Sequence, residues 1–226
     1  MLDGALRFLI LAQNRWLRKS RFVTWVLFGV KILPAERIHW DFTTLVLKKA
    51  LIKYTRPGQE VFEIGTGPYA LLSTFLIKRT PCRIMASDIN GDYVKRGIEN
   101  ARHNRADISI IQSDLLQRAS GRFDIIFWNS VYIPREAGIK YGVSSLYLSE
   151  TDWCGGDSGY EAIAKFLAEA GSHLSESGRI LLGYNEFYLK RKAVEELCRA
   201  NGFVIGEFVS SKFNPGVVAV MARVTG

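Results

Sequence analysis

Cysteine and histidine are scarce in this chain of 226 residues, which contains three of each. A disulfide framework needs an even set of cysteines, and a zinc site needs ligands clustered at short spacing. Neither pattern is present, because these residues are scattered along the chain: Cys82, Cys154, Cys198, His39, His103 and His173. The sequence therefore predicts no disulfide framework and no metal site, and a reducing, cytoplasmic location fits it best.

Long apolar runs are also missing. The run from Phe22 to Leu33 is shorter than the roughly 20 residues that a membrane-spanning helix needs, and it contains Lys31. No small-residue cleavage site follows it. We therefore expect neither a transmembrane helix nor a secretory signal, while peripheral contact with a membrane stays open.

The signatures of three enzyme classes are absent from the sequence. It has no Ser-His-Asp or Cys-His arrangement, no metal-binding pair of histidines and no phosphate loop that carries a lysine. These absences argue against a hydrolase, a metalloenzyme and a nucleoside triphosphatase.

The composition can form a core, and it carries a basic excess at one end. With 48% hydrophobic residues the chain can bury one sizeable core, and it is short for two full domains. The formal net charge is +8, of which the segment before Pro34 supplies +5, from Arg7, Arg15, Arg18, Lys19, Arg21 and Lys31 against Asp3. Such a segment suits nucleic acid, an anionic membrane face or an acidic protein, or it is a solubilising surface on a helical cap.

The N-terminal pattern differs from the rest of the chain. From Leu2 to about Leu33, apolar residues at helical spacing alternate with Arg and Lys, which predicts one or two amphipathic helices that cover the domain or form a substrate lid. Pro34 breaks the pattern, and a further helix is expected from Asp41 to Tyr54. We therefore expect a basic helical extension at residues 1–39 and one catalytic domain at residues 40–226.

Strand and helix signals then alternate, which predicts an α/β fold with a parallel sheet. After an opening strand near Glu60, strands are expected at 83–87, 108–112, 124–128 and 179–184, and helices at 69–78, 91–103, 160–174 and 188–200. The last two strands, 203–211 and 217–224, are too close in sequence for a helical crossover, so they should pair as an antiparallel hairpin at the sheet edge. A seven-stranded, mostly parallel sheet with one reversed strand follows.

The stretch Glu-Val-Phe-Glu-Ile-Gly-Thr-Gly at residues 60–67 ends an apolar strand in an acid and a Gly-x-Gly turn. Glycine lets the chain turn sharply and lets another molecule approach the backbone, and the helix that follows points unpaired N–H groups at the turn. The residues expected to hold an adenosine-bearing ligand here are Glu63, Gly65, Thr66 and Gly67.

Two further acids follow strands at suitable distances. Asp88 ends the second strand, 23 residues after Gly65, where an acid can accept hydrogen bonds from ribose hydroxyls or can simply cap the next helix. Asp114 follows the third strand, where its carboxylate could accept from an adenine amino group. We expect Ile89 and Leu115 to contact the same ligand.

This order of features resembles the class I S-adenosylmethionine-dependent methyltransferases over roughly residues 40–224: Glu-x-Gly-x-Gly, a strand-end Asp, Asp-Leu and a reversed terminal hairpin. The resemblance implies a Rossmann-like fold and S-adenosylmethionine as the cofactor. A dehydrogenase is the main rival, since Ala70 can stand at the third position of the dinucleotide-binding motif. The hairpin tail and the fourth strand favour the methyltransferase.

The fourth strand runs into Asn129-Ser130-Val131-Tyr132, which resembles the Asn-Pro-Pro-Tyr signature of methyltransferases that modify planar nitrogens, with both prolines replaced. The resemblance implies that the asparagine oxygen and the next backbone carbonyl accept hydrogen bonds from the substrate N–H groups, while the aromatic ring packs on the substrate plane. Asn129 and Tyr132 are therefore the expected catalytic pair, with Asn129 also beside the cofactor. Such acceptors orient the nitrogen and favour the positive charge that develops on it.

The segment from Trp153 to Tyr160, Trp-Cys-Gly-Gly-Asp-Ser-Gly-Tyr, resembles the Gly-Gly-x-Asp-Gly-Leu segment of the HemK/PrmC-type glutamine methyltransferases. The part before Trp40 is too short and too basic to resemble their helical recognition domain. The resemblance therefore implies the fold, the cofactor and nitrogen chemistry, and it does not extend to a release factor as substrate.

Residues 133–157 are expected to form a long loop with a functional role. Its aromatic side chains could line a substrate pocket, stack bases beside Arg135 and Lys140, or form a small core of their own. The aromatic residues concerned are Tyr141, Tyr147 and Trp153.

Together these features predict an S-adenosylmethionine-dependent methyltransferase that acts on an amide or amine nitrogen of a protein, a peptide or a small molecule. Methylation of RNA or DNA bases, small-molecule O-methylation and a non-catalytic methyltransferase-like module are the alternatives. The acceptor, the oligomeric state and the role of residues 1–33 do not follow from the sequence.

Overall fold

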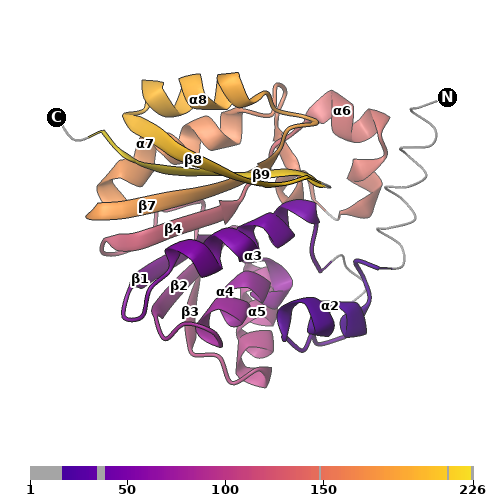
Figure 1. Cartoon of the computed structure of the whole chain (residues 1–226). Coiled ribbons are helices and arrows are strands. Elements are labelled where there is room, and N and C mark those ends of the chain that lie inside the picture. Colours follow the sequence, from indigo (N-terminus) through magenta and orange to yellow (C-terminus); the bar gives the residue numbers. More distant parts are fainter. Residues whose placement is uncertain (1–16, 35–38, 148, 213, 225–226) are drawn as a thin grey trace.

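A seven-stranded sheet forms the centre of the computed structural model, which describes residues 17–34, 39–147, 149–212 and 214–224 (Figure 1). The strand order is β3-β2-β1-β4-β7-β9-β8. Neighbouring strands from β3 to β7 run parallel, whereas β9 runs antiparallel to both β7 and β8. The strands are β1 (Glu60–Ile64), β2 (Arg83–Asp88), β3 (Ile108–Gln112), β4 (Phe123–Asn129), β7 (Leu174–Asn185), β8 (Phe203–Ser211) and β9 (Asn214–Arg223). The predicted sheet with one reversed strand and a terminal hairpin is confirmed.

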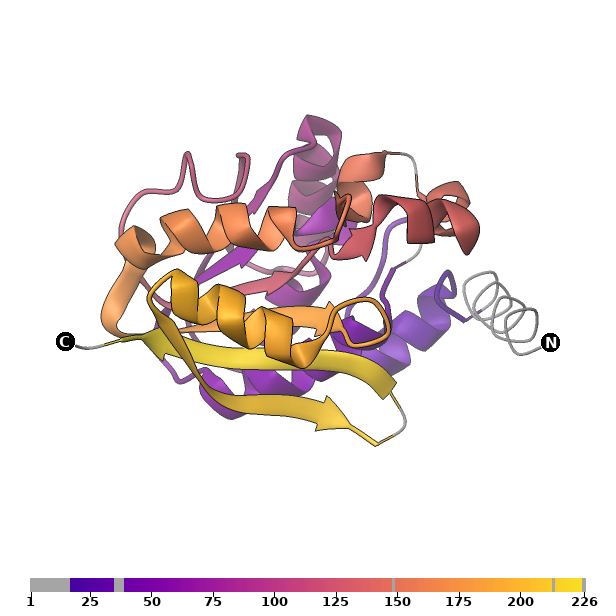
Figure 2. The same cartoon turned by 90° about the horizontal axis from the view of Figure 1, so that it is seen from above.

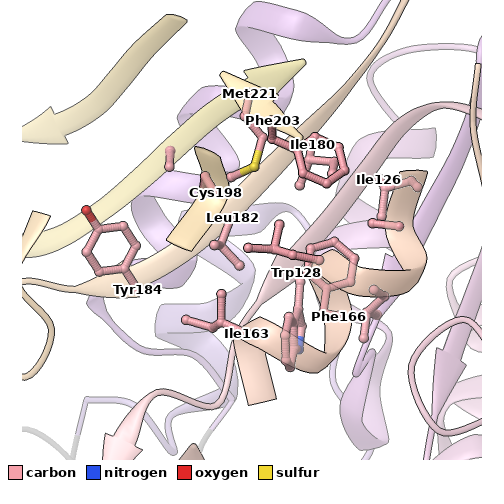
Figure 3. Close-up of a cluster of buried hydrophobic side chains, with 14 of the residues drawn as sticks. Ile126, Trp128, Ile163, Phe166, Ile180, Leu182, Tyr184, Cys198, Phe203 and Met221 are labelled. Carbon is pink, nitrogen blue, oxygen red and sulfur yellow. The ribbon is translucent and has the colours of Figure 1, made fainter. Parts of the chain in front are cut away.

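Helices cover both faces of this sheet, as expected for a sheet whose central strands are continuous apolar runs. One face carries α3 (Phe42–Tyr54), α4 (Leu71–Ile77) and α5 (Gly91–His103), and the other carries α7 (Glu161–His173) and α8 (Arg191–Ala200). Figure 2 shows α7 and α8 side by side over their face. Trp128 of β4 packs there edge-on against Phe166 of α7, with ring centroids 5.4 Å apart, inside a buried apolar cluster (Figure 3). Each face of the sheet thus has its own core layer.

The start of α3 is fixed by a reciprocal pair of hydrogen bonds. The carboxylate of Asp41 accepts from the backbone N–H of Thr44 (2.7 Å), and the Thr44 hydroxyl accepts from the backbone N–H of Asp41 (3.0 Å). This capping box satisfies two backbone donors that the first turn of a helix otherwise leaves without partners. It also places the Asp41 carboxylate beside the end of β4, where it becomes part of the site described below.

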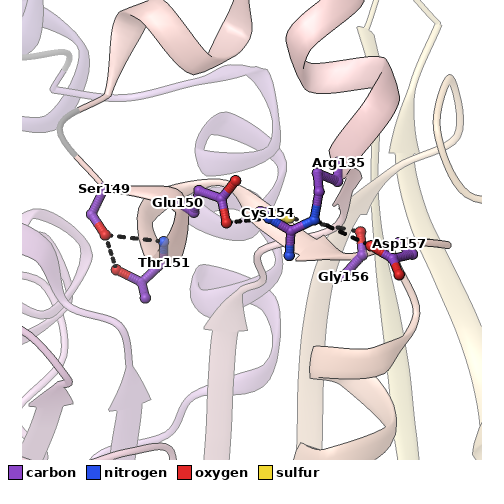
Figure 4. Close-up of polar contacts among 7 residues, drawn as sticks. All are labelled: Arg135, Ser149, Glu150, Thr151, Cys154, Gly156 and Asp157. Carbon is purple, nitrogen blue, oxygen red and sulfur yellow. Dashed lines mark hydrogen bonds and ion pairs between the residues drawn. The ribbon is translucent and has the colours of Figure 1, made fainter.

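The prediction of one long loop at residues 133–157 is wrong in its structure. This segment contains β5 (Ile133–Pro134), α6 (Arg135–Lys140), β6 (Cys154–Gly156) and two short 3₁₀ helices, Val143–Leu146 and Glu150–Asp152. The strands β5 and β6 form a separate parallel pair. Arg135 holds the segment together through ion pairs to Glu150 and, at 3.1 Å, to Asp157 (Figure 4). The sequence lacked a periodic pattern here because each of these elements is only two to six residues long.

The N-terminal segment contributes one described helix, α2 (Arg21–Phe28). The helical pattern predicted for residues 2–16 lies outside the described residues. Phe28 on the inner face of α2 and the residues Val30 and Ile32 after it are buried and share an apolar cluster with Trp40 and with α3 and α4. A division of the chain at residue 39 stays a prediction, and no described helix is long and apolar enough to cross a membrane.

Candidate active site

A cavity of about 500 Å³ opens at the carboxyl ends of β1, β2 and β4. In open parallel sheets this edge is where ligands bind, because the loops that leave adjacent strands converge there. The cavity is lined by three groups of residues: residues 63–69, 88–89 and 113–115 from the first strands; residues 128–133 from the end of β4; and Arg18, His39, Trp40, Asp41, Thr44, Tyr147 and residues 151–154 from the surrounding segments.

The Gly-x-Gly turn forms one wall of this cavity. Gly65 and Gly67 both have φ of +64°, a left-handed conformation that glycine adopts without strain. The N–H of Gly67 donates to Asp88 Oδ2 (2.8 Å), so the turn and the end of β2 are held together. The four predicted residues of the turn lie at one edge of the cavity, as the motif implies.

Glu63 is buried beneath this turn. Its Oε2 accepts from the hydroxyl of Thr66 (2.8 Å) and from that of Ser73 on α4. Burial is the largest influence on its pKa and raises it from 4.5 to about 7. Through its hydrogen bonds to Thr66 and Ser73, Glu63 connects the turn to α4. Glu63 also lines the cavity.

We predict that Glu63 makes the unliganded protein less stable as pH rises from about 4.5 to above 7. The unfolded state ionises near pH 4.5 and the folded state only near pH 7, so the folded state binds more protons in this window and its relative stability falls with pH. Glu63→Gln, which stays neutral, should gain stability over the wild type by up to about 3 kcal/mol between pH 5 and pH 8. Urea unfolding at both pH values measures this difference. Exposed Glu176→Gln is the control, and an equal change in both variants would contradict the assignment.

Asp88 lies at the centre of the cavity edge and is 7% exposed. Its Oδ1 accepts from the N–H of Asn90 (2.9 Å) and its Oδ2 from that of Gly67. Burial raises its pKa, and these two N–H donors oppose the rise. Each carboxylate oxygen keeps a second lone pair, so a pair of vicinal hydroxyls can donate to Asp88 without displacing the backbone. Its neighbour Ile89 is 45% exposed and also lines the cavity.

Asp114 and Leu115 line the same side of the cavity. Asp114 is ion-paired with Lys165 of α7, so an adenine amino group would share this carboxylate with a lysine. Leu115 has φ of +49°, which lets its backbone turn at the cavity edge. The sequence did not reveal the lysine partner, because it lies 51 positions further along the chain.

The two motif residues at and after the end of β4, Asn129 and Tyr132, both lie beside one acid, Asp41. Asn129 Nδ2 donates to Asp41 Oδ1 (3.2 Å) and to Thr44 Oγ1 (3.3 Å). The Tyr132 hydroxyl lies 3.4 Å from Asp41 Oδ2 and 3.1 Å from Thr43 Oγ1. Ile64 pairs with Trp128 in the sheet, so Asn129 follows directly beside Gly65 of the turn. The catalytic candidates therefore lie at the junction of the turn and the N-terminus of α3.

The hydrogen bonds of Asn129 determine which way its amide group faces. A carboxylate can only accept, and the Thr44 hydroxyl already donates to Asp41 Oδ1 (2.6 Å), so both neighbours require the Nδ2 side of the amide. Asn129 Oδ1 is buried and has no hydrogen-bond partner among the described residues. A buried carbonyl without a donor costs about 1–3 kcal/mol, and a substrate N–H group can offset this cost.

Comparison with characterised proteins identifies the family. A protein assigned as a protein N5-glutamine methyltransferase in Methanocaldococcus jannaschii is 30% identical over 140 residues, which cover 62% of this chain and 68% of that protein. This chain belongs to the class I S-adenosylmethionine-dependent methyltransferases of the HemK/PrmC type. The release factor glutamine methyltransferase of Streptococcus pneumoniae is 31% identical over 76% of this chain and 62% of that enzyme. That of Lactococcus lactis is 28% identical over 64% of this chain and 54% of that enzyme, so the matched part of the chain spans between 54% and 68% of these relatives. No family model matches the chain.

Solved structures support the same fold. A methyltransferase from Pyrococcus furiosus superposes over 98% of both chains, with a TM-score of 0.65 and 21% identity. The magnesium protoporphyrin IX methyltransferase of Synechocystis PCC 6803, solved with bound S-adenosylmethionine, superposes over 96% of this chain and 97% of its own, with a TM-score of 0.57 and 18% identity. S-adenosylmethionine is the cofactor of this methyltransferase, and the cavity offers the backbone turn, the strand-end acid and the apolar flanks that an adenosyl group requires.

Ser130 replaces the restraint that the missing proline would supply in this methyltransferase. Its backbone N–H (3.0 Å) and its hydroxyl (2.7 Å) both donate to the carbonyl of Gly183 on β7. A proline at this position would fix φ but could make neither bond. The turn after Asn129 is therefore anchored to the neighbouring strand by hydrogen bonds.

The Gly-Gly-Asp-Ser-Gly segment packs against this turn, backbone to backbone. A Cβ on Gly155 would lie 2.5 Å from the carbonyl oxygen of Gly159 and 2.8 Å from both Tyr132 Cα and the carbonyl oxygen of Val131. Atoms cannot approach so closely, and each of these contacts is rigid backbone. The glycine spacing that carries the family resemblance thus positions the motif that holds Asn129.

We predict that Gly155→Ala lowers both stability and methyl transfer. The added methyl must displace the turn at Tyr132, at a cost of about 1–3 kcal/mol. Chemical unfolding and turnover of the purified variant measure the two effects. Gly206→Ala is the control, because a Cβ there meets nothing within 4 Å and its φ is ordinary. Unchanged stability and turnover in Gly155→Ala would contradict the packing argument.

The three aromatic residues that the sequence analysis expects in a substrate pocket do not all lie at the cavity. Tyr147 and Trp153 line the cavity, but Tyr141 does not. Tyr141 packs against Phe187, with ring centroids 5.6 Å apart, because α6 ends at Lys140 and turns it toward the segment after β7. Its assignment to substrate binding stays a prediction, which this packing does not support.

The residues of the cavity wall that sequence reasoning missed include Arg18, His39 and Asp41. Arg18 Nε donates to the carbonyl of Trp40 (2.5 Å), which brings the N-terminal segment to the cavity. Burial lowers the pKa of His39 to about 4, so this side chain is neutral at physiological pH. Asp41 carried a sequence signal, since it precedes an expected helix, but that signal indicates a cap and not a site.

Proposed function

We propose that this methyltransferase transfers a methyl group to a side-chain amide nitrogen of a protein, with glutamine as the acceptor residue. The observation that supports this most is the buried, partnerless carbonyl of Asn129 beside the cofactor turn. Proteins similar in sequence carry the names protein N5-glutamine methyltransferase and ribosomal protein L11 methyltransferase, and both names state a protein acceptor. The scarcity of cysteine fits a cytoplasmic location, which is part of the proposal.

The arrangement at Asn129 suits a nitrogen whose lone pair is delocalised. S-adenosylmethionine supplies an activated methyl group, so orientation of the acceptor accounts for much of the remaining barrier. Asn129 Oδ1 and the backbone carbonyl of Ser130 can accept the two N–H groups of a primary amide and hold its nitrogen toward the turn. Both acceptors also favour the positive charge that grows on the nitrogen as its bond to carbon forms. The buried ring of Tyr132 forms the adjoining wall.

On the cofactor side, the proposal assigns each residue by its chemistry. Asp88 accepts from the ribose hydroxyls, and the backbone at Gly65 and Gly67 contacts the methionyl part. The carboxylate of Asp114 accepts a hydrogen bond from the adenine amino group, which competes with Lys165 for this carboxylate. The apolar side chains of Ile89 and Leu115 flank the ring. These assignments rest on the common cavity that the residues line.

Asp41 is proposed as a positioning residue, because it holds the amide of Asn129 without facing the reacting atoms. Asp41→Ala should lower kcat roughly 10- to 100-fold while cofactor affinity changes less than about twofold, since the amide can then rotate. Asp41→Asn keeps an oxygen that accepts from Asn129 Nδ2, so it should restore most of kcat. Steady-state kinetics and calorimetry with the cofactor separate these effects.

Loss of a helix cap alone is controlled by Ser20→Ala, because Ser20 caps α2 with a 3.3 Å hydrogen bond from Val23 N–H. Each cap contributes about 1 kcal/mol to stability. An equal loss of kcat in Asp41→Asn and Asp41→Ala would contradict the positioning role. A loss of kcat in Ser20→Ala as large as that in Asp41→Ala would contradict it as well.

The proposed acceptor class is tested by transfer of labelled methyl from S-adenosylmethionine to a cell extract. The product is separated by a size filter and treated with protease or ribonuclease. Label that stays on the filter and is released only by protease, followed by a methylated glutamine in the digested peptides, is the expected result. Release by ribonuclease, or label in the filtrate, would overturn the proposal in favour of a nucleic acid or a small molecule.

A further inference from the structure

The exposed face of α2 combines apolar side chains with basic neighbours. Ten large hydrophobic residues are exposed among the described residues, and four of them lie within ten consecutive positions. These are Leu17 (49% exposed), Phe22 (71%), Trp25 (50%) and Val26 (60%), with the Phe22 and Trp25 ring centroids 6.1 Å apart. Exposed apolar residues are ordinary when they are scattered singly, but a cluster of this kind marks a contact surface.

The helix is apolar on both sides. Thr24 and Phe28 face inward and are buried, while Phe22, Trp25 and Val26 follow the opposite side at helical spacing. A helix that is apolar all round is normally covered on every side. The outer side of α2 therefore lacks a cover in the described part of the chain.

The inner contacts of α2 fix this orientation. The Thr24 hydroxyl lies 2.8 Å from His39 Nδ1, and the side chain of Lys48 on α3 donates to the carbonyl of Leu27. Beyond the helix, Asn104, the C-cap of α5, accepts from Lys31 N–H (2.9 Å) and donates to its carbonyl (2.7 Å). Because these bonds hold both ends of the segment, the helix cannot roll over to bury its outer face without breaking them.

Charge indicates what covers this face. Residues 17–34 contain four basic residues and no acid. The exposed cations are Lys19 before the helix, Arg21 at its first position and Lys31 after it, and Arg21 Nε also donates to the carbonyl of Ile32 (2.7 Å). In the sequence this segment belongs to the N-terminal part that supplies +5 of the net charge. Basic residues around an exposed Trp, Phe and aliphatic cluster are the pattern of helices that lie in a membrane interface, where cations meet lipid phosphates.

We propose that the outer face of α2 docks on an anionic phospholipid surface. The cluster inserts its apolar side chains at the boundary between headgroups and acyl chains, and the three cations contact the phosphates. An RNA would use the cations and the rings but would gain nothing from Leu17 and Val26, which is why lipid is favoured. In Figure 1 α2 lies beside α4 and α5, at the other end of the view from α7 and α8. The inference does not depend on the acceptor proposed above.

The test is sedimentation of the full-length protein with vesicles of phosphatidylcholine alone and of phosphatidylcholine mixed with phosphatidylglycerol. Binding to the anionic vesicles is expected, with a blue shift of Trp fluorescence, because the other described tryptophans are buried. The triple variant Phe22→Ser, Trp25→Ser, Val26→Ser should bind at least about tenfold more weakly. Val204→Ser, which is 55% exposed on β8, should bind as the wild type does.

A pair of charge variants separates local charge from net charge. Lys19→Glu with Lys31→Glu should weaken binding by about fivefold or more for each site. Lys95→Glu with Lys192→Glu changes the net charge equally on exposed sites elsewhere and should have little effect. Equal binding to both kinds of vesicle, no binding to either, or equal losses in the two pairs would overturn the proposal. A dimer in solution that the triple variant dissolves, without vesicle binding, would assign the face to a second copy of the chain.

Discussion

Asn129→Ala is expected to reduce kcat for methyl transfer roughly 10²- to 10³-fold, the range seen when one preorganised hydrogen-bonding group is removed from a transition state. Its affinity for S-adenosylmethionine should change less than about twofold, because the backbone beside Gly65 remains in place. The physical reason is the loss of the Oδ1 acceptor, which leaves the acceptor nitrogen free to rotate away from the methyl group. Single-turnover kinetics and calorimetry measure the two quantities separately.

The fold should tolerate this substitution. Asp41 keeps the N–H and hydroxyl of Thr44 as donors after the amide is removed, so the cap of α3 survives. Asn201→Ala is a matched control, since Asn201 caps α8 far from the cavity and bonds only to Leu197 among the described contacts of its amide group. A kcat within about threefold of the wild type in Asn129→Ala would eliminate the planar-nitrogen mechanism. A large loss of cofactor affinity would instead move Asn129 to the cofactor side of the site.

The parts of the site that the sequence predicts are those that follow from strand ends. Strands β1, β2 and β4 are short apolar runs, and parallel strands in one sheet bring their carboxyl ends to one edge. Residues placed directly after such runs therefore meet, whatever their distance along the chain. Gly67, Asp88 and Asn129 each follow or end a strand, and all three line the cavity.

The parts that the sequence does not predict depend on contacts between distant segments. Asp41 meets Asn129 across 88 positions, and its own neighbourhood explains it fully as a helix cap. Tyr141 and Tyr147 looked equivalent as loop aromatics, but α6 directs the first away from the cavity. Such outcomes depend on the tertiary arrangement of elements too short to show a hydrophobic period.

The replaced prolines show how one geometry can arise from different residues. Proline restrains a turn through its own ring, a property visible in the sequence. Ser130 restrains it through two bonds to Gly183, and the acceptor of those bonds lies on another strand. The sequence therefore shows that the proline restraint is lost, but it does not show the hydrogen bonds that replace it. For this reason the motif can be recognised from the sequence, whereas the rigidity of the turn cannot.

Asp88→Ala is expected to weaken S-adenosylmethionine binding about 100-fold. Hydrogen bonds to a charged group contribute about 1.5–3 kcal/mol each, and every 1.4 kcal/mol is a factor of ten in affinity. The loss of even two such bonds from the ribose hydroxyls reaches this size before any local rearrangement. Asp88 also receives the N–H groups of Gly67 and Asn90, so its truncation releases the turn that faces the cofactor. Calorimetric titration with the cofactor measures the effect directly.

A graded pair of variants distinguishes ribose binding from support of the turn. Asp88→Asn keeps one oxygen that can accept from Gly67 or Asn90 but loses the charge, so it should preserve the unfolding free energy better than Asp88→Ala and still bind the cofactor at least about tenfold more weakly. Asp92→Ala, on the exposed first turn of α5, is the control for removal of a nearby carboxylate. Wild-type affinity in Asp88→Asn would show that the charge does not face the ribose, because a carboxylate that accepts two hydroxyl donors cannot be exchanged for an amide without loss.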